Sequence, residues 1–129
     1  MQGSYLFEYA VVRVVPKVER EEFLNVGVVV YCAEKKFLQA IFQLDEQRLR
    51  AFCQNCDVLE IKEYLHSFQR ICSGGPQAGP IGKMALADRF RWLTATRSTV
   101  IQTSNVHSGL TSDLPQMLLH LFSQLVLQA

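Results

Sequence analysis

The sequence predicts an α+β fold in which an antiparallel sheet of about four strands packs against about four helices, mainly on one face. Three observations support this prediction. Runs rich in aromatic and β-branched residues come first along the chain, and helix-like runs mostly follow. Two of the early apolar runs are joined by a short polar link, which is typical of an antiparallel hairpin. The later runs repeat apolar residues at helical spacing.

The first expected strand spans about residues 5–15, where SYLFEYAVVRVV is rich in aromatic and β-branched residues and Pro16 ends the run. Both sides of this run are apolar, so we expect a central strand covered on both faces. The runs VGVVVYC and KFLQAIFQL, separated by AEKK, predict the hairpin, and Gly27 indicates a bulge or a close backbone approach. STVIQT predicts a fourth strand, and the following TSNVHSG is typical of a turn.

The helices are expected after the hairpin. Asp45 and Asp57 are placed to cap two of them, and Glu60 follows Asp57 at capping-box spacing. LADRFRWLTA and SDLPQMLLHLFSQLVLQ predict two more helices. The last one is apolar nearly all round, so we expect it to be deeply buried or to form an interface, which includes one with a second copy of the chain. Residues 74–83 are rich in glycine and proline and predict a surface loop or a lid.

The composition indicates one globular domain over residues 1–129. Hydrophobic residues make up 49% of the 129 residues, charged residues 19%, and the formal net charge is +1. This balance supplies one core and lacks the basic excess of a dedicated DNA-binding domain. No apolar run approaches membrane-spanning length. The start, MQGSYLFEYAVVR, lacks the features of a signal peptide, so we expect a cytoplasmic protein.

The cysteine pattern indicates neither a metal nor a cofactor. Cys53 and Cys56 have zinc-like spacing, but a structural zinc site needs four ligands and the chain has no second such pair. No strand-like run precedes the pair as in thioredoxin-type motifs. In a cytoplasmic protein we therefore expect reduced thiols, with Cys53 packed as a small apolar residue.

Arg13 is a charge on a largely buried strand, and such a charge must be paired or must serve a site. One interpretation is an ion pair at the strand end with Glu21 or Glu22. The other is that Arg13 faces Arg97 and that the two form an anion-binding pocket.

Arg97, Ser98 and His107 are the second group of candidate residues. A strand of six residues is about 20 Å long, so Arg97 and His107 meet only if the chain folds back after the strand. Ser98 lies in no nucleophile elbow, which argues against a serine hydrolase. Arg97 is suited to clamp a carboxylate or phosphate. The alternative is that Arg97 pairs with an acidic residue and His107 caps a turn.

A third group suits a nucleic acid. Arg89 and Arg91 stand close to Trp92, a combination that stacks on bases and contacts phosphates. More often such a tryptophan packs under neighbouring arginine stems.

Three stretches together resemble a family of small bacterial proteins known as a domain of unknown function, whose members are often encoded beside a HipA-like kinase. They are YAVVRVVP, EFLNVGVVVYC and LTATRSTVIQTSNVHSG. The resemblance implies no catalytic residues, and Thr96 stands where the family pattern often has proline. The recurring polar and glycine positions of the family fall on Arg13, Asn25, Gly27, Arg97, Ser98, His107 and Gly109.

The resemblance implies a partner function. We therefore expect a non-catalytic interaction or regulatory module of a HipA-like kinase in a toxin–antitoxin or defence-type system, with binding residues among Arg13, Asn25, Arg97, Ser98 and His107. The apolar C-terminal helix suits docking to a protein. Two alternatives stay open. One is a small anion- or nucleotide-binding enzyme that uses Arg13, Arg97, Ser98 and His107, and the other is a nucleic-acid-binding protein centred on Arg89, Arg91 and Trp92.

Overall fold

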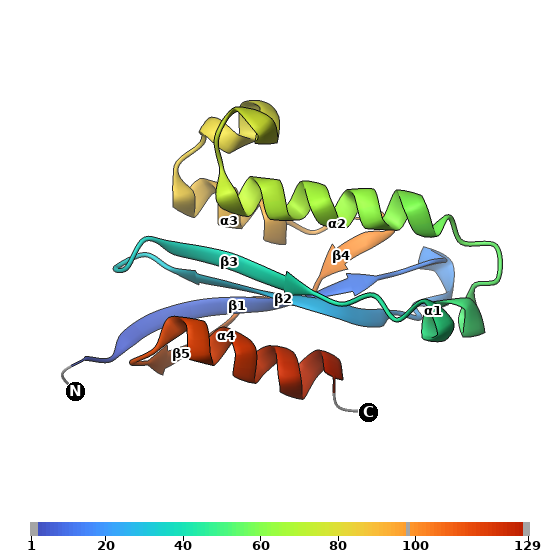
Figure 1. The fold of residues 1–129 in the computed structure, drawn as a ribbon, viewed down its shortest axis with the longest axis horizontal. Helices are drawn as coiled ribbons and strands as arrows, with labels where there is room; N and C mark the ends of the chain where they lie inside the picture. The colour runs from blue at the N-terminus through green and yellow to red at the C-terminus, as the bar shows by residue number, and fades with distance from the viewer. Residues whose placement is uncertain (1–2, 98, 128–129) are drawn as a thin grey trace.

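The computed structural model describes residues 3–97 and 99–127, in which an antiparallel five-stranded sheet lies between two layers of helices (Figure 1). The sheet has the order β3-β2-β1-β4, and β5 also pairs with β1. All the pairings are antiparallel. The first strand is therefore central, as its apolar faces predict. The strands are β1 (Tyr5–Val14), β2 (Leu24–Cys32), β3 (Phe37–Phe42), β4 (Ile101–Thr103) and β5 (His107–Thr111).

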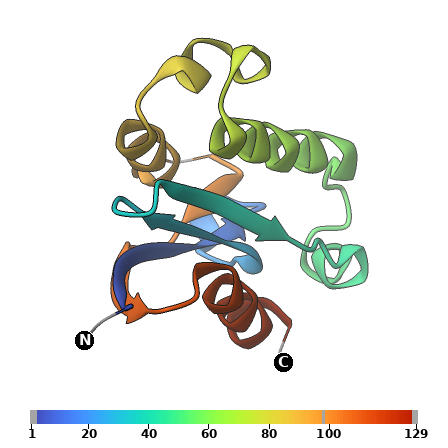
Figure 2. The same ribbon diagram turned by 60° about the vertical axis from the view of Figure 1, so that its left-hand side comes forward.

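The helices cover both faces of this sheet (Figures 1 and 2). On one face, α2 (Val58–Ser73) and α3 (Leu86–Thr94) pack with Val12, Val14 and Val29. On the other face, α4 (Leu114–Phe122) and the π-helical turn η3 (Ser123–Leu127) pack with Phe7, Val28 and Val30. The α+β class and the antiparallel sheet are confirmed. The expected placement of helices on one face holds for α2 and α3, whereas α4 covers the opposite face because β1 and β2 are apolar on both sides.

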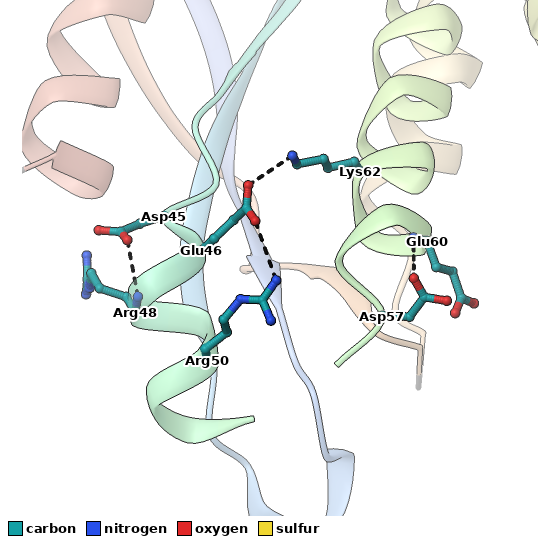
Figure 3. Close-up of polar contacts among 7 residues, drawn as sticks. All are labelled: Asp45, Glu46, Arg48, Arg50, Asp57, Glu60 and Lys62. Carbon is teal, nitrogen blue, oxygen red and sulfur yellow. Dashed lines mark hydrogen bonds and ion pairs between the residues drawn. The ribbon is translucent and has the colours of Figure 1, made fainter. Parts of the chain in front are cut away.

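Aspartate side chains cap the N-termini of the first two helices, and an ion pair joins the two helices (Figure 3). Before α1 (Glu46–Phe52), Asp45 Oδ1 accepts from the Arg48 N–H at 3.2 Å, and before α2 Asp57 Oδ1 accepts from the Glu60 N–H at 3.1 Å. Both predicted caps are confirmed. Glu46 on α1 forms ion pairs with Lys62 of α2 at 3.0 Å and with Arg50 at 3.7 Å. Because these side chains are exposed, each ion pair contributes little to stability.

TSNVHSG is typical of a turn, but the chain does not fold back after β4. Ser104 interrupts the edge strand and then β5 continues along β1, with His107 opposite Tyr9. The Val11 N–H donates to Ser104 Oγ at 2.9 Å, and the Ser104 N–H donates to the Val11 carbonyl at 2.8 Å. The buried serine hydroxyl thus replaces a backbone carbonyl at the break and keeps both segments on one edge.

Gly27 lies at a β-bulge, which confirms the expectation for this position. The pairing shifts from Val12 opposite Gly27 to Arg13 opposite Asn25. A Cβ atom on Gly27 would lie 2.2 Å from Phe42 Cδ1 and 2.6 Å from the Ile41 carbonyl oxygen. Only glycine fits this close approach between β2 and β3.

Two connections differ from expectation. Cys53 and Cys56 form a disulfide between the end of α1 and the start of α2, so the expectation of reduced thiols is wrong for this pair, while Cys32 and Cys72 are free and buried. The segment expected as a loop or lid forms 3-10 turns, η2 (Pro76–Lys83), that pack through Ala78 and Ile81 against the core. The charged connection before β2 holds one 3-10 turn, η1 (Val18–Arg20).

Candidate functional site

Arg13 and Asn25 face each other across β1 and β2, at the bulge, on the side covered by α4. The Arg13 guanidinium carbon lies 4.1 Å from the centre of the Phe23 ring. Asn25 Nδ2 donates to the Leu125 carbonyl at 3.1 Å, which joins β2 to the end of the C-terminal helix. The interpretation of Arg13 as an ion-pair partner of Glu21 or Glu22 is wrong, because Arg13 stacks on Phe23 and Glu22 pairs with Arg20.

Two polar atoms of this pair are buried without a hydrogen-bond partner in the described part of the chain. They are Arg13 Nε, a donor, and Asn25 Oδ1, an acceptor. The two residues are directly opposite each other, and the unused donor of Arg13 is complementary to the unused acceptor of Asn25. The arrangement is best explained as a support for the α4 end rather than as a ligand site, since both atoms are closed off from solvent.

Arg97 borders a cavity of about 260 Å³ between α2, the end of α3 and β4. Its guanidinium carbon lies 4.0 Å from the centre of the Trp92 ring, and its Nη2 donates to the Trp92 carbonyl. Partial burial lowers the pKa of Arg97 from its ordinary value. The expected pairing of Arg97 with an acidic residue is wrong, since its partners in the described part of the chain are the ring and carbonyl of Trp92.

The structure does not bring the candidate anion-binding residues together. Arg13 points to the α4 face, because Val12 and Val14 on either side of it pack against the α2 face. Arg97 lines the cavity on the α2 face. His107 lies exposed on β5, where its ring centre is 5.4 Å from that of Tyr9, so the expected turn-cap role is wrong. Ser98 lies outside the described residues.

The residues proposed for nucleic-acid binding also have separate surroundings. Arg89 Nη1 donates to the carbonyls of Ile71 and Cys72 at 2.8 and 2.9 Å, so its charge is used at the C-terminus of α2. Arg91 is exposed on α3, and Trp92 is stacked by Arg97. The three side chains therefore do not form one basic surface with a free aromatic ring.

Sequence reasoning missed an apolar patch on the sheet edge. Leu6 of β1 and Leu110 of β5 are directly opposite each other, and 63% and 66% of their surface is exposed. No pattern in HSGLT alone signals this pairing, because the segment had been expected as a turn. The contact between Leu6 and Leu110 can be recognised only once β5 is known to pair with β1.

No cluster of three or more histidine, cysteine, aspartate or glutamate side chains that could hold a metal occurs among the described residues. None of the helices within residues 3–97 and 99–127 has the length and apolar character needed to cross a membrane.

The chain is a small α+β domain, in which an antiparallel sheet lies between two layers of helices. An arginine borders an apolar cavity on one side of this sheet. Residues 9–126 match the model of the DUF3037 family, described as a protein of unknown function. The chain belongs to this family. No curated protein and no solved structure gives a significant match.

Proposed function

We propose that this chain is a non-catalytic interaction module that docks a protein partner at the edge formed by β1 and β5. The observation behind this proposal is the pair Leu6 and Leu110, two neighbouring leucines that are each more than 60% exposed. An exposed apolar pair on a sheet is costly in water and becomes favourable when a partner covers it.

The position of this pair on an edge strand indicates how the partner binds. β5 pairs with β1 and with no second strand among the described residues, so it lies at an edge of the sheet (Figure 2). The outward backbone N–H and C=O groups of such an edge strand are available to another chain. An extended segment adds to such an edge through backbone hydrogen bonds, and its alternate side chains reach one face. The partner segment we propose is therefore a strand with apolar residues facing Leu6 and Leu110.

A HipA-like kinase of a bacterial toxin–antitoxin or defence-type system is the partner we propose. Its support is the resemblance of YAVVRVVP, EFLNVGVVVYC and LTATRSTVIQTSNVHSG to a family often encoded beside such kinases. Membership of a family without assigned chemistry is compatible with a binding role.

The test is co-expression of this chain with a HipA-like kinase from the same genome, followed by size-exclusion chromatography. We expect one co-eluting complex, which Leu6→Asp combined with Leu110→Asp separates into two peaks. Leu59→Asp on α2 is the matched control, because Leu59 is 73% exposed but lies away from the edge, and it should leave the complex intact. Two separate peaks with the unchanged chain would reject the kinase as a stable partner. A complex that the double variant leaves intact would reject the β1–β5 edge.

A further inference from the structure

We propose that the cavity between α2, α3 and β4 is a binding site for a small carboxylate that carries a flat apolar group. The cavity has a volume of about 260 Å³, slightly below the range of about 300–1,000 Å³ that is typical of small-molecule pockets. The ligand is therefore smaller than a drug-sized molecule. This site is separate from the β1–β5 edge and does not depend on the docking proposal.

The walls of the cavity suit an apolar group. Its apolar lining residues come from three elements or their flanks: Phe68 and Ile71 from α2, Leu93 from α3, and Val100 and Ile101 from the start of β4. Along α2 the lining residues recur at helical spacing, which places one continuous face toward the cavity. Tyr64 and Trp92 line it as well and are 45% and 39% exposed, so two aromatic rings stand at its mouth.

Arg97 supplies the anion-binding group. It is the one cation among the lining residues that the structure describes, and no carboxylate lies within ion-pair distance of it in that part of the chain. Stacking on Trp92 and one hydrogen bond to the Trp92 carbonyl hold the guanidinium in place. A guanidinium has five N–H donors, so most of them stay available for a ligand.

A single guanidinium favours a carboxylate over a phosphate. One planar fork matches the two oxygens and the single charge of a carboxylate, whereas a phosphate dianion needs further donors or cations. Two polar lining residues already donate to backbone carbonyls: Gln102 Nε2 donates to the Thr99 carbonyl, and Thr99 Oγ1 donates to the Ile101 carbonyl. Partial burial strengthens the attraction between Arg97 and an anion because less water screens it.

The test uses 2-naphthoate as the probe and its neutral analogue 2-naphthamide as the comparison. Binding is measured by isothermal titration calorimetry and by the indole N–H resonance of Trp92, since the chain has one tryptophan and it lines the cavity. We expect saturable binding of 2-naphthoate with a shift of the Trp92 resonance. We expect the amide to bind at least about tenfold more weakly, because it lacks the charge that pairs with Arg97.

Two variants and one control locate the site. Arg97→Gln should weaken 2-naphthoate binding by at least about tenfold. Ser67→Phe, which keeps Arg97 and fills the cavity from α2, should abolish it. Arg91→Gln removes the same charge from an exposed position of α3 that does not line the cavity, and it should change the affinity by less than about twofold. Circular dichroism confirms that each variant is folded.

Three results would overturn the proposal. One is equal affinity for the acid and the amide, which would show that charge is not recognised. Another is unchanged binding by folded Arg97→Gln or Ser67→Phe protein. The third is displacement of 2-naphthoate by an equal concentration of inorganic phosphate, which would assign the site to phosphates instead.

Discussion

Arg89 shows how one side chain organises a helix end. Its guanidinium donates to the Ile71 and Cys72 carbonyls of α2 and, through Nε, to the Met84 carbonyl at 3.2 Å. Gly74 leaves room for it, since a Cβ there would lie 2.5 Å from Arg89 Nη1. A cation at this position also interacts favourably with the helix dipole.

Replacing Arg89 should therefore destabilise the fold. We expect Arg89→Met, which keeps the apolar stem, to lower the free energy of unfolding by about 2–3 kcal/mol, since hydrogen bonds from a charged donor are lost. The measurement is urea unfolding followed by circular dichroism. Arg91→Met, at an exposed position two residues along α3, should stay within about 0.5 kcal/mol of the unchanged chain. Equal losses for the two variants would contradict the capping role.

Cys72 should make stability fall in alkaline solution. Burial is the main cause that raises the pKa of this thiol from 9.0 to about 12. Above pH 9 the unfolded chain therefore releases a proton that the folded chain retains, so the free energy of unfolding falls by about 1.4 kcal/mol per pH unit up to about pH 12. Below pH 9 both states keep the proton and this contribution is constant.

The comparison that isolates this effect is Cys72→Ala. All other ionisable side chains are present in both proteins, so their contributions cancel in the difference. Urea unfolding from pH 8 to pH 11 should show a shallower decline for the variant. Parallel declines would mean that the thiol ionises equally in the folded and unfolded chain.

The Cys53–Cys56 disulfide closes a very short loop in the connection between α1 and α2. Cross-linking so few residues removes little freedom from the unfolded chain, so reduction should lower the free energy of unfolding by roughly 2 kcal/mol. Thiol titration of the denatured protein should find the two free cysteines, Cys32 and Cys72, before reduction and all the cysteines after it. Cys53→Ser combined with Cys56→Ser should match the reduced protein. Four reactive thiols in the untreated denatured chain would show that the bond is absent.

The elements that local chemistry specifies were predictable from the sequence. Asp45 and Asp57 begin helices because a carboxylate accepts from a backbone N–H in the first turn. β5 was not predictable, because His107–Thr111 has no strand pattern of its own and forms by pairing with β1. Tertiary pairing overrode the turn propensity of serine and glycine in this segment.

The candidate site was less predictable than the fold. Arg13 and Arg97 share a chemistry, but one points to the α4 face and the other lines a cavity on the α2 face. Assigning those faces requires knowing that helices cover both sides of the sheet. The apolar faces of the strands indicate that both sides are covered, yet they do not say which helix covers which side.

The exposed leucines and the low net charge together affect how the isolated chain behaves. With a net charge of +1 there is little repulsion between molecules, and the Leu6–Leu110 pair is uncovered. We therefore expect the purified chain to self-associate near neutral pH when no partner is present. Leu6→Lys combined with Leu110→Lys should make it monomeric and leave the free energy of unfolding within about 0.5 kcal/mol, because both positions are exposed. Size-exclusion chromatography with light scattering measures the mass.

Leu119→Lys is the matched control, since Leu119 is 54% exposed on α4. If Leu119→Lys makes the chain monomeric and the double change does not, then the C-terminal helix mediates self-association and the β1–β5 edge does not.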